Sequence, residues 1–149
     1  MALVGWISDS GSFVNHALLL YAAEHIPCLI IDCANAANPH ALFPEVPLEN
    51  MSQIYVIELE LLYKFRDVLI QAPRFLDRLE AKHLVVTTPG VLFNYQDELE
   101  NHNIMEQAWE LMRSLGNSYT VVVGVLRNSV HHSFAQNYCH TLEVSWATL

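Results

Sequence analysis

The sequence predicts an α/β fold, a three-layer sandwich in which helices cover both faces of a mostly parallel sheet. Three observations support this fold class. Short apolar runs alternate with helix-like segments along the 149-residue chain. Most of these runs are continuously apolar, as in strands that are buried on both faces. The chain length fits one domain, so we expect residues 1–149 to form a single unit.

Five apolar runs are interpreted as strands of the sheet: 2–7, 27–32, 53–59, 83–88 and 119–126. A sixth run, 140–146, alternates between apolar and polar residues, which favours a strand at the edge of the sheet. Turn residues end the first run, and Pro89-Gly90 ends the fourth.

Helices are predicted between these strands, over residues 14–23, 61–71, 73–81 and 98–115. Asn15 or Ser12 is expected to cap the first helix. Pro73 suits a first helical turn, which divides the segment 61–81 into two helices. The last helix carries an apolar stripe and is expected to end at Gly116. The stripe consists of Leu99, Ile104, Ala108, Leu111 and Leu115.

The charges are unequal and unevenly distributed. Sixteen acidic residues and seven basic residues give a net charge of −9, and the first basic residue is Lys64. Nucleic acids and anionic membranes are polyanions, so this balance opposes direct binding to either. The basic stretch from Lys64 to Lys82 is balanced by Asp67, Asp77 and Glu80. A DNA-binding accessory factor is therefore the third choice of function.

The cysteine content bears on the cellular compartment of the protein. Cys28, Cys33 and Cys139 form no CxxC pair, and their odd number favours reduced thiols and a cytoplasmic protein. Cys28 and Cys33 are expected in the core. The N-terminus lacks the cationic start of a signal peptide, and no apolar run is long enough for a membrane span.

The stretch SDSGSFVNH, residues 8–16, lies where nucleotide-binding proteins hold phosphate, between a strand and a helix. A phosphate loop reads GxxxxGK[ST], and its lysine neutralises the phosphates. This stretch has no lysine, and Asp9 adds a negative charge. The position is that of a phosphate loop, but the chemistry is that of a plain turn.

Four segments resemble, in order, the core of the RecA/RadA recombinase superfamily: SDSGSFVNHALLLYAA, CLIIDCANAANPHALF, HLVVTTPGVLF and NIMEQAWELMRSLGNSYTVVVGVL. They are similar to the family's phosphate loop and helix, its second strand, its Walker B strand, and its long helix with the next strand. The resemblance covers residues 3 to about 146. It implies a minimal RecA-like, P-loop-type core.

The departures from the family pattern fall on its chemical positions. Five residues stand at the glycine, lysine and Ser/Thr positions of the phosphate loop, in this order: Ser8, Gly11, Phe13, Val14 and Asn15. Thr87 replaces the Walker B aspartate, and Cys33 and Ala34 stand where a Thr and a catalytic Glu are usual. Phosphoryl transfer depends on positioning and charge stabilisation. The resemblance therefore implies a degenerate paralogue that neither binds nor hydrolyses ATP and that needs no cofactor or metal.

We therefore expect a catalytically inactive pseudo-ATPase domain that acts through protein–protein interaction, with a partner or by self-association. The resemblance implies an accessory or regulatory paralogue in DNA recombination or repair. Trp146, on the predicted edge strand, is the candidate interface aromatic. The apolar residues Leu61, Leu62, Phe65 and Leu69 are expected in the core, although such a stripe also suits a partner helix.

The alternative is a small-molecule binder or enzyme that uses the carboxyl edge of the sheet, where ligands of open α/β sheets bind. Its crevice would contain Asp9, Asp32 and Asn35. Asp32 also suits a structural role as a turn or helix cap, which is the commoner use. A Cys–His hydrolytic pair, with Cys33 beside His16 or His40, has no glycine elbow to support it.

Histidines and cysteines gather near the C-terminus as His131, His132, Cys139 and His140. Adjacent residues of a strand point to opposite faces, so these pairs do not suit one zinc ion. We expect a polar loop with surface histidines.

Overall fold

The computed structural model describes residues 1–145, so the candidate interface residue Trp146 lies outside the described part. Within that part, six strands form one sheet in the order β3-β2-β4-β5-β1-β6, and every pairing is parallel. The strands are β1 (Ala2–Ser8), β2 (Cys28–Asp32), β3 (Ile54–Glu58), β4 (His83–Val86), β5 (Thr120–Leu126) and β6 (His140–Glu143). The predicted α/β fold is confirmed, with a sheet that is entirely parallel.

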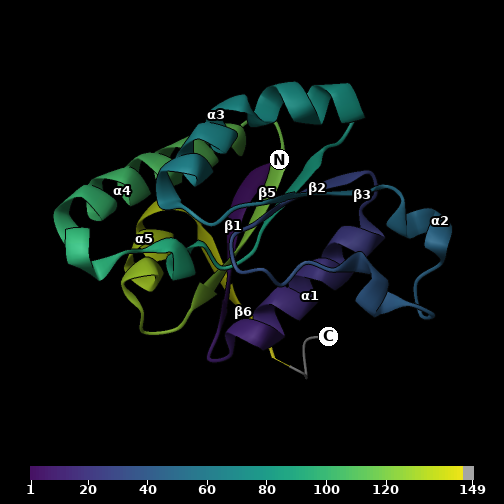
Figure 1. The fold of residues 1–149 in the computed structure, drawn as a ribbon, viewed down its shortest axis with the longest axis horizontal. Coiled ribbons are helices and arrows are strands. Elements are labelled where there is room, and N and C mark those ends of the chain that lie inside the picture. Colours follow the sequence, from purple (N-terminus) through teal and green to yellow (C-terminus); the bar gives the residue numbers. More distant parts are fainter. Residues whose placement is uncertain (146–149) are drawn as a thin grey trace.

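Helices cover both faces of the sheet (Figure 1). One face carries α1 (Gly11–Glu24), η1 (Pro39–Leu42) and α2 (Leu48–Met51). The other face carries α3 (Leu62–Leu79), α4 (Glu98–Leu115) and α5 (Val130–Tyr138). Two short turns, η2 (Pro89–Leu92) and η3 (Tyr95–Asp97), connect β4 to α4.

Each face of the sheet has its own apolar core because successive side chains of a strand point in opposite directions. Ile30 of β2 packs in the cluster under α1, whereas its neighbours Leu29 and Ile31 pack in the cluster under α3 and α4. All five residues of β2 are buried. This burial explains why the strand is continuously apolar in sequence.

One helix, α3, covers the segment that was predicted as two helices. Pro73 lies inside it, where it removes one backbone hydrogen bond. Phe65, Leu69, Ala72 and Leu76 are all buried along one side of α3. This continuous burial on both sides of Pro73 stabilises the helix through the proline, so the prediction of a helix boundary there was wrong.

The segment after β5 was expected to be a polar loop, but the structure forms α5 there. Ser129 caps the helix, because its side chain accepts a hydrogen bond from the backbone N–H of His132. Phe134 and Ala135 are buried against the rest of the domain. His131 is buried as well, so the expectation of surface histidines is wrong for this residue.

The other helices show smaller differences from the prediction. Ser10 caps α1, in place of Ser12 or Asn15, which both lie within the helix. The α4 helix ends at Gly116 as predicted. Leu99 does not belong to its buried stripe, since it is 78% exposed, whereas Trp109 is fully buried.

Candidate functional site

The candidate site lies at the carboxyl edge of the sheet, where β1 meets α1. Only two residues, Asp9 and Ser10, separate the strand from the helix. Ser8 Oγ accepts a hydrogen bond from the backbone N–H of Ser10 at 3.2 Å, and Ser10 Oγ accepts one from Phe13 at 3.2 Å. A phosphate loop surrounds its ligand with several backbone N–H groups. This turn is too short for that, and its serine side chains already bond its own backbone.

Four of the five phosphate-loop positions lie inside α1, namely Gly11, Phe13, Val14 and Asn15. Phe13 is half-buried in the first turn of the helix. Val14, at the position of the lysine, is a fully buried residue of α1. Gly11 is the first residue of the helix and has a negative φ, so its flexibility is not used to shape a loop.

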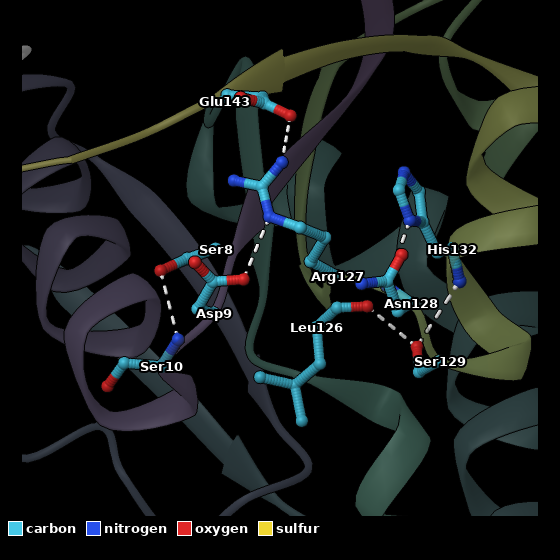
Figure 2. A network of polar contacts seen from close by, with 9 residues as sticks. All are labelled: Ser8, Asp9, Ser10, Leu126, Arg127, Asn128, Ser129, His132 and Glu143. Carbon is cyan, nitrogen blue, oxygen red and sulfur yellow. Dashed lines mark hydrogen bonds and ion pairs between the residues drawn. The ribbon is translucent and has the colours of Figure 1, made fainter.

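A basic residue does reach this edge, but two carboxylates hold it (Figure 2). Arg127 follows β5, and its Nε donates a hydrogen bond to Asp9 Oδ1 at 2.8 Å. Its Nη1 donates to Glu143 Oε1 at the end of β6. Glu143 and Asp9 raise the pKa of the Arg127 guanidinium above its ordinary value. The single positive charge of Arg127 is therefore outnumbered by the carboxylates that it bonds.

An open cavity of about 440 Å³ lies beside these residues. Its polar lining includes Asp9, Ser10, Ser12, His16 and Arg127. The hydroxyl groups of Ser10 and Ser12 are partners of each other, since their Oγ atoms lie 3.1 Å apart. The carboxylate of Asp9 makes the cavity a poor match for a polyphosphate.

Asp32, a residue of the predicted crevice, lies in the interior at 1% exposure. Its carboxylate accepts hydrogen bonds from the backbone N–H groups of Ala34, Ala36 and Ala37. It also accepts one from Thr87 Oγ1, at 2.9 Å. Asp32 thus fixes the loop after β2 and does not present a free oxygen to a ligand.

Thr87, at the Walker B position, follows β4 and is buried. Besides donating to Asp32, its Oγ1 accepts hydrogen bonds from the backbone N–H groups of Cys33, at 2.8 Å, and Ala34, at 3.2 Å. Thr87 therefore connects the ends of β4 and β2, and its hydroxyl group is used within the protein.

Asn15, at the Ser/Thr position of the phosphate loop, bonds Thr88. Asn15 Nδ2 donates to Thr88 Oγ1 at 3.1 Å, and the Thr88 backbone N–H donates to Asn15 Oδ1 at 3.0 Å. Gly124 of β5 gives the pair its space, because a Cβ there would lie 2.9 Å from Leu18 Cδ1 and 3.3 Å from Thr88 Cγ2. Sequence reasoning missed this pair, whose members lie 73 positions apart.

The remaining candidates have separate environments. Asn35 is exposed at a φ of 53°, a left-handed conformation that asparagine tolerates, and it stays a prediction as a ligand contact. Cys33 is buried, and burial, followed by the charge of Asp32, raises its thiol pKa well above the ordinary value. His16 and His40 are exposed. This thiol is therefore a poor nucleophile.

Two further features of residues 1–145 concern metal ions and membranes. No group of three or more His, Cys, Asp or Glu side chains in this range is placed to hold a metal ion. In the same range, no helix combines the length and apolar character that a membrane crossing requires. Of the five bases from Lys64 to Lys82, Arg66 bonds Asp67 and Gln107.

Comparison with known proteins shows which fold this chain has. No protein-family model matches the chain, and no curated protein matches it either. Among solved structures, it is similar to the KaiC-like protein PH0186 from the hyperthermophilic archaeon Pyrococcus horikoshii OT3, with a TM-score of 0.64. The match covers 96% of this chain and 71% of that chain at 11% identity. The domain therefore has a RecA-like fold, as the sequence resemblance implied.

Proposed function

We propose that this chain is a catalytically inactive RecA-like domain that works through contacts with other proteins, as an accessory or regulatory subunit in the cytoplasm. One observation carries the proposal. The protein's own hydrogen bonds use the side chains at the positions where a RecA-like ATPase would hold phosphate and metal. Asn15 bonds Thr88, and Thr87 bonds Asp32.

The charges at this edge support the same proposal. ATP brings several negative charges, which an ATPase neutralises with a lysine, a metal ion and backbone N–H groups. Here Val14 stands at the lysine position and is buried, while Asp9 lies in the cavity. Arg127 is held by Asp9 and Glu143. Binding ATP would break this ion-pair network without gaining a free cation.

The outer surface of α3 and α4 supports a role in protein contact. Two hollows of about 560 and 660 Å³ lie between these helices and share Arg66, Asn103 and Gln107, so they adjoin one another. Their apolar lining includes Ile70 and Leu99, and Glu100 and Glu106 add negative charge. We define this surface as the α3–α4 groove. Its shape and charge suit a partner helix that carries basic residues beside an apolar stripe.

The process served is inferred from resemblance. The four sequence segments resemble the RecA/RadA superfamily, and the fold agrees with that resemblance. Inactive paralogues of an assembling ATPase are suited to dock against the active copies. We therefore propose recombination or repair as the process and a RecA-like ATPase as the first partner to test.

The test is a tagged purification from the native cell, with and without nuclease, using three forms of the protein. The wild type should retain a RecA-like protein in a stoichiometric, nuclease-insensitive complex. Ile70→Glu should no longer retain the partner, because the substitution places a charged carboxylate in the apolar part of the α3–α4 groove. Leu48→Glu is the matched control, since Leu48 and Ile70 are both 58% exposed but Leu48 lies on α2.

Two results would overturn the proposal. One is Mg·ATP hydrolysis by the purified chain that Asp9→Asn or Asp32→Asn abolishes. The other is a chain that stays alone, as a monomer or homodimer, in every purification. The second result would favour a small-molecule function.

A further inference from the structure

His131 is an anomaly in this structure. Its side chain is buried, at 5% exposure, and neither ring nitrogen forms a hydrogen bond. A neutral imidazole has one donor and one acceptor, and buried polar groups in native proteins nearly always have a partner. The pKa of His131 is lowered by burial, so the ring is neutral near pH 7. Its two unused positions call for a group that the described residues do not supply.

His131 also lines a cavity of about 140 Å³. The cavity lies at the carboxyl ends of β4 and β5, between the η2 turn and α5, and its lining does not include Asp9, Arg127 or Glu143. Its walls include Gly90, Val91, Tyr95 and Val125. Ligands of open α/β sheets bind outside the carboxyl ends of the strands. A volume of roughly 150 Å³ is enough for a molecule of the size of benzene.

Two neighbouring residues, Gly90 and Phe93, fix the position of the His131 ring. A Cβ at Gly90 would lie 2.5 Å from Cδ2 and 3.0 Å from Nε2 of the His131 ring. No side chain therefore fits at position 90 while the imidazole stays where it is. Phe93 packs edge-on to the same ring, with 5.7 Å between the ring centroids, and holds it from another side.

The lining defines the chemistry of a ligand. None of the residues that line the cavity is charged, which disfavours an ionised molecule. Thr88 Oγ1 already bonds Asn15, and Ser129 Oγ already bonds Leu126 and His132. Among the buried side chains that line the cavity, His131 is thus the one whose polar atoms form no hydrogen bond at all. The aromatic rings of Phe93 and Tyr95, 4.8 Å apart, lie beside it.

We propose that this cavity binds a small uncharged aromatic molecule with one hydroxyl or ring N–H group, and that His131 is its hydrogen-bond partner. The ring of the ligand fills the apolar space, and its polar group pairs with the imidazole. This site does not depend on the proposed function, because a domain that works through protein contacts can also carry such a ligand.

The experiment compares phenol with toluene. The two molecules have nearly the same shape, but toluene carries a methyl group where phenol carries its hydroxyl group. Binding to the whole chain is followed by calorimetry and by the ¹⁵N resonances of the His131 ring. We expect phenol to bind about tenfold more tightly than toluene, because the net contribution of one hydrogen bond corresponds to a difference in affinity of this size. The ¹⁵N resonances of the His131 ring should shift more at saturation with phenol than with toluene, because only phenol can form a hydrogen bond with the imidazole. His131→Phe should remove the preference for phenol.

Two further variants keep the test valid if His131→Phe does not fold. Val91→Trp should block the cavity and abolish binding of both compounds. Val130→Trp, on an exposed residue of α5 that does not line this cavity, should leave both affinities unchanged. Equal affinities of phenol and toluene, or no saturable binding with unchanged His131 resonances, would overturn the proposal.

Discussion

Asn15 and Thr88 exchange two hydrogen bonds across the carboxyl edge of the sheet, at 3.0 and 3.1 Å. Asn15 belongs to α1 and Thr88 follows β4, so the pair connects the first helix to the middle of the sheet. Both residues are buried. The two hydrogen bonds hold this helix and this strand end together without any charged group.

The first prediction concerns this pair. Asn15→Leu leaves the buried Thr88 N–H without a partner and should lower the free energy of unfolding by about 2 kcal/mol. Thr88→Val removes only the hydroxyl group and should cost about 1 kcal/mol. Urea unfolding of both single variants and the double variant should show a coupling energy of about 1 kcal/mol.

The control for this cycle is His16→Ala. His16 is the next residue of the same helix and is exposed, so the variant should stay within about 0.5 kcal/mol of the wild type. Purely additive losses at Asn15 and Thr88 would contradict the reciprocal bonding.

The second prediction concerns Asp32. Asp32→Asn replaces an acceptor by an NH₂ group that faces the backbone N–H groups of Ala36 and Ala37. Buried groups would be left without acceptors, so thermal or urea unfolding should show a loss of about 3 kcal/mol. Glu58→Gln is the matched control, since Glu58 is paired with Asp32 in the sheet register but is exposed. A loss of equal size in both variants would show that Asp32 has no special structural role.

The strands of this fold could be predicted from the sequence because burial on both faces leaves a local signal, a continuous apolar run such as residues 119–126. The α5 helix was missed because its buried side is small and includes a histidine. The division at Pro73 was wrong because packing of α3 outweighs the lost hydrogen bond.

The candidate site was harder to predict because its contacts join distant parts of the chain. Arg127 and Asp9 are 118 positions apart, and nothing local in either segment indicates the pairing. The sequence did place Ser8 and Asp9 at the carboxyl edge of β1. It also allowed two roles for Asp32, and the hydrogen bonds of the structure favour the cap.

The third prediction concerns pH. Burial lowers the pKa of His131, so the folded state binds a proton less readily than the unfolded state, where the ordinary value is about 6.5. The contribution of the neutral His131 to the free energy of unfolding is therefore complete above about pH 6.5. It is lost as the pH falls from there toward the pKa that His131 has in the folded state. Urea unfolding at pH 7.5, 6.5 and 5.5 should show this loss.

His131→Phe should weaken that pH dependence without removing it. Burial, His25 and the terminal amino group also lower the pKa of His83. Protonation of His83 therefore also lowers the stability of the folded state as the pH falls. Tyr21, whose OH lies 2.8 Å from His83 Nδ1, packs against both His25 and His83. An unchanged pH dependence in His131→Phe would assign the whole effect to the His83 cluster.

The last prediction concerns the thiols. Burial raises the pKa of Cys28 to about 12 and that of Cys139 to about 11. The reactive form is the thiolate, so alkylation by iodoacetamide at pH 8 should be at least about 100-fold slower in the folded protein than in urea. Cys33, fully enclosed after β2, should react as slowly as Cys28. Peptide mass spectrometry measures each site separately. Rapid alkylation of Cys33 in the folded chain would instead indicate an activated thiol, and it would reopen a Cys–His hydrolytic function at this edge of the sheet.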